Sequence, residues 1–156
     1  VIAVCHRGQD GDSLLLVELL ARHSLLPVRE AEERQPATPG VVHLAPSGYH
    51  LMLEADGRFM LSTDPRVRFV RPSVDVLFQT AADVHREGLL AAVLTGANDD
   101  GADGLVAVRR RGGYALVQDP EEAEAPQMPQ AALKRAGADA VIRLAGIALT
   151  INERCP

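Results

Sequence analysis

The fold of this chain is decided by residues 89–105, which read Leu89-Leu90-Ala91-Ala92-Val93-Leu94-Thr95-Gly96-Ala97-Asn98-Asp99-Asp100-Gly101-Ala102-Asp103-Gly104-Leu105. The apolar run at the start of this segment predicts a buried strand, and the residues that follow the segment continue as a helix over 105–111. Between strand and helix lies an acidic turn, residues 94–104, with three aspartates and three glycines. In an open α/β sheet, chemistry collects at the carboxyl ends of the strands. The acidic turn is therefore a candidate site.

The three aspartates of the acidic turn have two interpretations. In the first, Asp99, Asp100 and Asp103 are N-cap and first-turn residues, because the dipole of the following helix favours carboxylates there. In the second, Asp99 or Asp100 orients a catalytic group or acts in catalysis itself. The spacing of the aspartates does not separate the two interpretations, so other parts of the chain must decide.

Composition places the chain among ordinary globular domains. Its 156 residues fit one domain, and 47% of them are hydrophobic, with 3% aromatic and no Trp. A core of Leu, Val, Ile and Ala suits a parallel sheet covered by helices on both faces. The net charge of -5 argues against nucleic acid as a partner. No apolar run reaches the ~20 residues of a membrane span, and the two distant cysteines suit a reducing, cytoplasmic location.

Apolar runs and helical spacing alternate along the chain, which predicts right-handed crossovers and parallel strands. Strands are expected at residues 1–5, 27–31, 41–44, 49–54, 58–62, 89–94, 114–118 and 140–144. Helices are expected from Asp12 to Ser24, from Ser73 as N-cap to Arg86, and at residues 105–111, 130–136 and 146–154. Asp56-Gly57 predicts a tight turn between the fourth and fifth strands. The fold class is thus α/β, a doubly wound, mainly parallel sheet with flanking helices and one β-hairpin.

His6 is the histidine whose position indicates chemistry. It follows the first strand directly, and Asp100 occupies the matching place after the strand at 89–94. A histidine and an aspartate at two carboxyl strand ends are the orienting half of a nucleophile–His–Asp arrangement, in which the carboxylate fixes the imidazole tautomer. The nucleophile is missing, since no serine sits in a Gly-x-Ser-x-Gly elbow. Cys5 is rejected because neighbouring strand residues point to opposite faces.

Metal and nucleotide signatures are lacking in the sequence. The five histidines form no H-x-x-x-H pair, and the acidic turn places Gly or Ala where a calcium loop needs oxygen ligands. Neither the G-x-x-x-x-G-K-[ST] loop nor the G-x-G-x-x-G turn occurs. We therefore expect no metal and no cofactor.

Several blocks of the sequence resemble one known family. The acidic turn looks like the acidic signature of CheB-type protein-glutamate methylesterases, and further blocks agree in order and spacing. These blocks are Pro27-Val28-Arg29-Glu30-Ala31-Glu32, Val42-His43-Leu44-Ala45-Pro46 with Gly48-Tyr49-His50-Leu51, Arg71-Pro72-Ser73-Val74-Asp75-Val76-Leu77-Phe78, and Gly112-Gly113 through Gln118-Asp119-Pro120 to Met128-Pro129. The resemblance covers essentially the whole chain.

The resemblance assigns roles to individual residues. His6 matches the catalytic histidine of the family and Asp100 its catalytic aspartate, so Asp99 and Asp103 return to the capping role. Ala97 lies where the family has a residue whose backbone N–H helps to form the oxyanion hole, and a main-chain donor survives a change of side chain. Arg71 has two interpretations: it steers a carboxylate of the receptor, or it forms a pair within the fold that has only a structural role.

The family's serine lies upstream of the His strand, in a Gly-x-Ser-x-Gly-Gly turn. We therefore expect residues 1–156 to be a single CheB-type methylesterase catalytic domain that is N-terminally truncated, lacking the strand and helix that carry the Ser nucleophile. Such a polypeptide is expected to be inactive by itself, because loss of the nucleophile of a triad costs several orders of magnitude in rate. It is also expected to associate through an unpaired sheet edge.

The resemblance implies hydrolysis of glutamate γ-methyl esters, and glutamine deamidation, on bacterial chemoreceptors in chemotactic adaptation. The partners that it implies are methylated chemoreceptor helices, with a receiver domain or other chemotaxis proteins. The alternative is a non-catalytic receptor-binding signalling module, or an inactive fragment.

Overall fold

The structure is a computed structural model that describes residues 2–4 and 13–155. The strands are β1 (Ile2–Val4), β2 (Val28–Glu30), β3 (Val42–Leu44), β4 (His50–Leu53), β5 (Phe59–Ser62), β6 (Leu90–Val93), β7 (Tyr114–Gln118) and β8 (Ala140–Ile142). The helices are α1 (Ser13–His23), α2 (Val74–His85), the short 3₁₀ helix η1 (Arg86–Gly88), α3 (Ala102–Arg110), α4 (Gln127–Arg135) and α5 (Leu144–Arg154).

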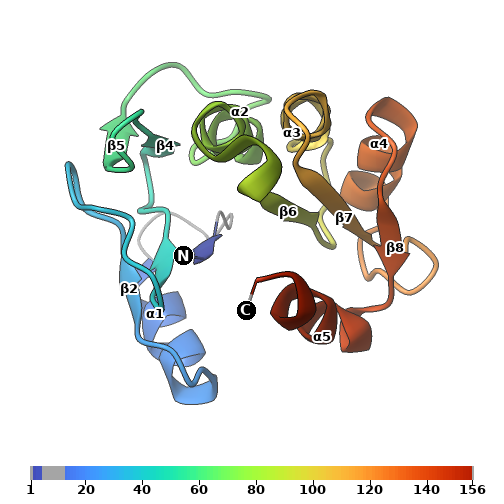
Figure 1. The fold of residues 1–156 in the computed structure, drawn as a ribbon, viewed down its shortest axis with the longest axis horizontal. Helices are drawn as coiled ribbons and strands as arrows, with labels where there is room; N and C mark the ends of the chain where they lie inside the picture. The colour runs from blue at the N-terminus through green and yellow to red at the C-terminus, as the bar shows by residue number, and fades with distance from the viewer. Residues whose placement is uncertain (1, 5–12, 156) are drawn as a thin grey trace.

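The fold has the expected class, an α/β arrangement with parallel strands, flanking helices and one hairpin (Figure 1). Among the described residues, the parallel strands are divided between two three-stranded sheets, in the orders β1-β3-β2 and β6-β7-β8. β4 and β5 form the antiparallel hairpin, in which Leu53 faces Phe59 across the expected Asp56-Gly57 turn. Gly57 has a φ of 78°, the left-handed region that glycine enters at no steric cost.

Helices lie on both sides of the β6-β7-β8 sheet, with α3 and α4 on one side and α5 on the other (Figure 1). The main core forms between this sheet and the helices α2, α3 and α4. Its fully buried members are Ala82, Ala91, Val93, Leu105, Val108, Ala115, Val117 and Ala132. A second core joins α2 to the hairpin, around Leu51, Phe59 and Leu77. Helix α2 therefore belongs to both cores.

Two helices begin earlier than their sequence pattern indicates. α3 begins at Ala102 rather than at residue 105, because Gly104 is a poor helix former that tertiary packing nevertheless accommodates. α4 begins at Gln127 rather than at residue 130, since Pro129 lies in the first turn, where no backbone N–H needs an intrahelical partner. Leu144 opens α5 instead of ending a strand.

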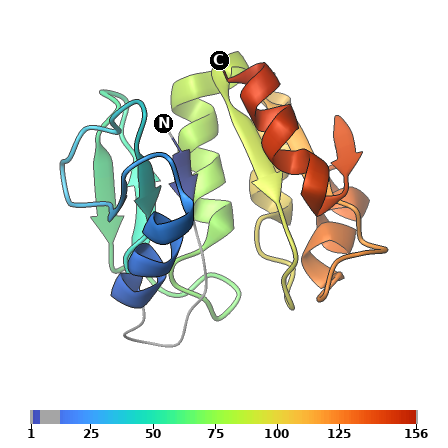
Figure 2. The same cartoon turned by 90° about the horizontal axis from the view of Figure 1, so that it is seen from below.

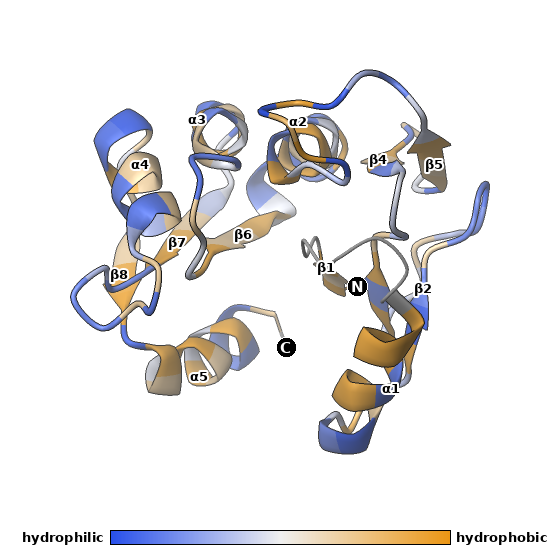
Figure 3. Cartoon of the chain, turned by 180° about the vertical axis from the view of Figure 1, so that it is seen from behind, coloured by the Kyte–Doolittle hydropathy of each residue, from blue (hydrophilic) through white to orange (hydrophobic). Residues whose placement is uncertain are grey.

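Helix α1 is rich in apolar residues, which are orange in Figure 3, and part of its apolar surface is exposed. Leu14, Leu15 and Leu19 are exposed, whereas Leu16 and Val17 are half-buried. None of the helices described is both long enough and apolar enough to cross a membrane.

The connections that matter for the site lie at one end of the molecule. In Figure 2 the segment that follows β6 and the segment that precedes α2 both lie at the lower end. β6 pairs in parallel with β7, so the carboxyl ends of both strands point the same way. The acidic turn therefore emerges at the carboxyl edge of this sheet, as expected.

Candidate functional site at the carboxyl end of β6

The first half of the acidic turn is fixed by the end of β7, by the segment before α4 and by the first turn of α4. The N–H of Thr95 donates to Oε1 of Gln118 at 2.8 Å, and the Ala125 N–H donates to the Thr95 hydroxyl, also at 2.8 Å. The Gly96 carbonyl accepts from the Met128 N–H at 2.9 Å. A Cβ on Gly96 would overlap Sδ of Met128, so a glycine permits this close approach. The path of the turn toward Asp100 is thus set by tertiary contacts.

Asp100 is the buried carboxylate of the acidic turn, with an exposed fraction of 3%. Its Oδ1 accepts from the Ser73 hydroxyl at 2.7 Å and from the Asp75 N–H at 3.0 Å, while Oδ2 accepts from the Val74 N–H at 2.6 Å. The Asp100 N–H itself donates to Oδ1 of Asn98 at 3.0 Å. Asp100 therefore satisfies N–H groups at the start of α2, which have no intrahelical partner.

Ser73 lies at the N-cap of α2, as the sequence predicts, but its side chain makes no capping hydrogen bond. Its hydroxyl donates to Asp100 instead, and Asp100, from a distant part of the chain, serves as the cap. The sequence thus predicted the N-cap residue correctly, but the prediction that the Ser73 side chain caps the helix is wrong. The reason is that a carboxylate accepts stronger hydrogen bonds than a hydroxyl and here reaches two N–H groups at once.

Asp75, in the first turn of α2, joins Asp100 to α3. Its Oδ1 accepts from the Gly104 N–H at 2.7 Å. Burial raises the pKa of Asp75; the Gly104 N–H opposes the increase, the Asp100 charge adds to it, and Arg68 opposes it. A Cβ on Gly104 would lie 2.7 Å from Cβ of Phe78 and 2.9 Å from Cα of Asp75, so α2 and α3 approach each other closely here.

Arg68 gathers three carboxylates around its guanidinium group. Its Nη2 donates to Oδ2 of Asp103 at 2.7 Å and its Nε donates to Oδ2 of Asp75 at 3.2 Å, while Nη1 pairs with Asp99. Nε of Arg135 also donates to Asp103, at 2.7 Å. The hydrogen bond with Arg135 is the main cause that holds the pKa of Asp103 below its usual value.

The three aspartates therefore have three different environments. Asp103 lies in the first turn of α3, as predicted. Asp99 does not cap this helix: the N-cap is Gly101, with no side-chain cap, and the Asp99 carboxylate pairs with Arg68. The capping prediction for Asp99 is wrong because its carboxylate pairs instead with Arg68, a cation from the β5–α2 connection. Sequence reasoning missed Arg68, which has no local signal, since its partners Asp99 and Asp103 are 31 and 35 positions away.

Ala97 and Arg71 are the other two site residues that the sequence singled out. Ala97 is exposed in the acidic turn, and no hydrogen bond between described residues uses its N–H. Nη1 of Arg71 donates to the carbonyls of Thr63 and Asp64, at 2.6 and 3.0 Å. These bonds fit the structural interpretation of Arg71, and its role toward a substrate stays a prediction. His6 and Cys5 lie outside the described residues.

Two further histidines, His43 and His50, are buried within the fold. Nε2 of His43 accepts from the Thr38 N–H at 3.4 Å, and the ring lies 4.8 Å from that of Phe59. Burial lowers the pKa of His43, and the positive charge of Arg29 lowers it further. His50 contacts the carbonyl of Pro65 through Nε2 at 3.2 Å. In the part of the chain that the structure describes, no group of three or more His, Cys, Asp or Glu could hold a metal ion.

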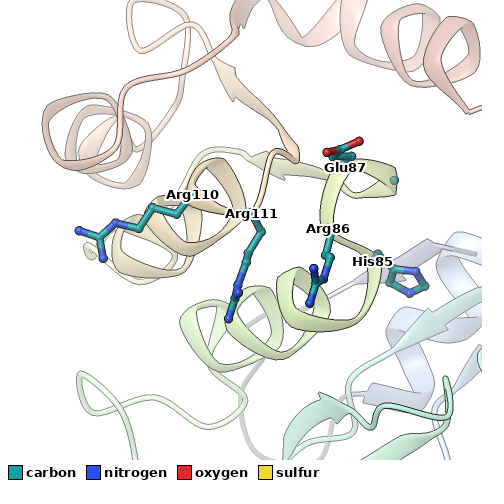
Figure 4. Close-up of a pocket in the computed structure, with 6 residues that line it drawn as sticks. His85, Arg86, Glu87, Arg110 and Arg111 are labelled. Carbon is teal, nitrogen blue, oxygen red and sulfur yellow. The ribbon is translucent and has the colours of Figure 1, made fainter.

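A pocket of about 550 Å³ lies at the carboxyl ends of α2 and α3 (Figure 4). It is lined by His85, Arg86, Glu87, Gly88, Arg110 and Arg111. Arg111 pairs with Asp83, and Figure 4 shows the Arg86 side chain pointing the same way as Arg111. The pocket is at the far ends of these helices from the acidic turn and takes no part in the candidate site.

The fold and the site define an α/β domain with a buried carboxylate at the carboxyl end of a parallel strand. The family described as CheB methylesterase matches residues 1–151, and the chain belongs to this family. The resemblance noted from the sequence is therefore confirmed.

Individual relatives agree with this assignment. A protein of Leptospira interrogans, whose name includes protein-glutamate methylesterase/protein-glutamine glutaminase, is 42% identical over 95% of this chain and 76% of its own length. The protein-glutamate methylesterase FrzG of Myxococcus xanthus is 35% identical over 97% of this chain and 46% of its own length. The crystal structure of the Thermotoga maritima CheB methylesterase catalytic domain is 32% identical, with a TM-score of 0.94 over 97% of this chain and 82% of that chain. The expected fold class is confirmed by this match.

Proposed function

We propose that residues 1–156 form a methylesterase catalytic domain that hydrolyses glutamate γ-methyl esters, and deamidates glutamines, on bacterial chemoreceptors. The observation that carries the proposal is the buried Asp100 carboxylate at the carboxyl end of β6. It is supported by the names of the relatives, which are protein-glutamate methylesterases and protein-glutamine glutaminases. Such a domain acts in the cytoplasm, on methylated receptor helices, together with a receiver domain or other chemotaxis proteins.

In this proposal Asp100 orients the imidazole of His6. A carboxylate offers about four acceptor positions, and Ser73, Val74 and Asp75 use three of those on Asp100. No other donor among the described residues uses the remaining position on Oδ2, and in this proposal an imidazole N–H takes it. Accepting that proton fixes the tautomer of His6 and stabilises the imidazolium that forms during the reaction.

The proposed reaction runs through an acyl-enzyme on a serine outside the printed sequence. His6 takes the serine proton as Oγ attacks the γ-carbonyl carbon, and it then protonates the departing methoxide, so that methanol is released. A water adds to the acyl carbon while His6 takes its proton, and that proton returns to the serine as the glutamate carboxylate leaves. With a glutamine substrate the leaving group is ammonia. The Ala97 N–H donates to the oxyanion in both tetrahedral intermediates.

The test measures methanol release from a methylated chemoreceptor by the full-length gene product. We expect His6→Ala to lower kcat by about 10³-fold or more, as removal of a triad histidine does. The matched control is His85→Ala, because His85 is exposed and lies at the far end of α2. Full activity of His6→Ala would overturn the proposal. Receptor binding without any turnover by the wild type would favour the non-catalytic signalling module.

A further inference from the structure

The segment between β5 and α2 contains a tight turn with an unusual backbone. The Val70 N–H donates to the Val67 carbonyl at 2.9 Å and the Val67 N–H donates to the Val70 carbonyl at 3.1 Å, as in a two-residue hairpin. The two central residues, Arg68 and Phe69, have φ values of 49° and 65°. Turns with positive φ at both central positions are dominated by Asn and Gly, because a larger side chain is strained there.

The Arg68 half of this turn is explained by its ion pairs. Its guanidinium group contacts Asp99, Asp103 and Asp75, and so ties the turn to both sides of Asp100. Figure 2 shows the segment before α2 at the same end of the molecule as the segment after β6. The turn is therefore held beside the proposed site rather than at a distance from it.

The Phe69 half of the turn has no such explanation within the described residues. Its side chain is 90% exposed, so the ring contributes little to either core. A strained backbone conformation that presents a large apolar side chain to water points to a function, since strain of this kind persists where the surrounding structure enforces it. Aromatic side chains, Phe among them, are also enriched in protein interfaces.

We propose that Phe69 is a docking residue for the protein substrate: its ring packs against apolar side chains that flank the modified glutamate on the receptor helix, while Arg68 anchors the turn beside Asp100. This inference rests on the proposed function. The occupant is the substrate segment next to the ester, because the turn is continuous with the site through the Arg68–Asp99 pair. A small ester that lacks the helix has no apolar side chains to pack against the ring.

The experiment compares two substrates of the full-length protein: a methylated chemoreceptor and N-acetylglutamate γ-methyl ester. The variant is Phe69→Asn, which removes the ring and suits the left-handed backbone, so it folds at least as stably as the wild type. We expect KM for the receptor to rise about tenfold, the effect of losing one aromatic anchor. Both kcat and KM for the small ester should stay within about twofold of the wild type.

Two further variants make the comparison specific. Phe69→Leu keeps an apolar side chain and should restore much of the affinity for the receptor. Leu149→Gln, on the exposed face of α5, removes an apolar side chain of 63% exposure and should leave both substrates unchanged. An unchanged KM for the receptor in Phe69→Asn would overturn the inference, and so would an equal loss on both substrates or a change in oligomeric state by sedimentation.

Failure of the proposed function is distinguishable from failure of the docking role. If the wild type hydrolyses neither ester, the proposed function fails, and the docking role is then read from the Kd for the methylated receptor. A Kd that rises about tenfold in Phe69→Asn supports docking even then, and an unchanged Kd overturns it.

Discussion

The hydroxyl of Ser73 donates to Oδ1 of Asp100 at 2.7 Å, so the residue at the N-cap position of α2 is itself held by the carboxylate that caps the helix. The contact joins positions that are 27 residues apart and connects the acidic turn to α2. Because the backbone N–H groups of Val74 and Asp75 donate to the same carboxylate, the start of α2 and the orientation of Asp100 depend on each other.

The first prediction concerns this shared carboxylate. Asp100→Asn places an NH₂ group where an acceptor faces N–H donors, so at least one buried donor loses its partner. We expect the free energy of unfolding to fall by about 1–3 kcal/mol, the cost of an unsatisfied buried polar group. Urea unfolding of the full-length protein at pH 7 measures the change.

The control for this prediction is Asp83→Asn, because Asp83 is an exposed member of an ion pair and should change stability by less than about 1 kcal/mol.

Ser73→Ala should cost about 1 kcal/mol in the wild type and less when Asp100 is already Asn, since the two residues share one hydrogen bond. Strict additivity of the two substitutions would contradict the coupling.

A second prediction follows from the close approach of α2 and α3. Gly104→Ala puts a Cβ against Cβ of Phe78 and the backbone of Asp75, neither of which is the end of a flexible side chain. We expect a loss of about 1–3 kcal/mol in stability from this overpacking, together with weaker activity if Asp75 and Asp100 shift. Thermal unfolding measures the loss, and Gly88→Ala, where a Cβ would meet nothing within 4 Å, is the control. An equal effect of both substitutions would rule out the packing explanation.

A third prediction is a pH dependence that arises from His43. Burial and Arg29 lower its pKa in the folded state, while the unfolded chain has the ordinary value of 6.5. As the pH falls through 6.5, His43 therefore takes up its proton in the unfolded state before it does so in the folded state. The free energy of unfolding decreases because of this group as the pH falls from 6.5 to the lower pKa of the folded state. The slope from this one group is at most about 1.4 kcal/mol per pH unit.

The measurement for His43 is the free energy of unfolding in urea from pH 7.5 down to pH 5. His43→Gln keeps an acceptor for the Thr38 N–H but does not titrate, so its stability should depend less on pH than that of the wild type. Leu149→Gln removes no titratable group from the exposed face of α5, so it is the control and should leave the pH dependence as it is. Parallel curves for the wild type and His43→Gln would contradict the prediction.

Sequence reasoning succeeded where local chemistry decides the structure. The Asp56-Gly57 turn lies within the hairpin as predicted, and β7 has the bounds predicted from the Gly112-Gly113 stop. It did not predict the first turn of α3, because Gly104 has a low helix propensity. In the structure this turn is helical and packs against Asp75. Sequence reasoning also failed for Asp99, whose partner Arg68 is 31 positions away and gives no local pattern.

The sequence by itself determined the order of strands and helices, the family, and the place of the acidic turn after β6, because periodicity and turn chemistry are local properties. It did not determine which of three similar aspartates is buried, since their spacing suits capping equally well. Only the tertiary structure decided this. The N-terminus of α2 meets Asp100 and buries it, whereas Arg68 holds Asp99 and Asp103 in ion pairs nearer the solvent.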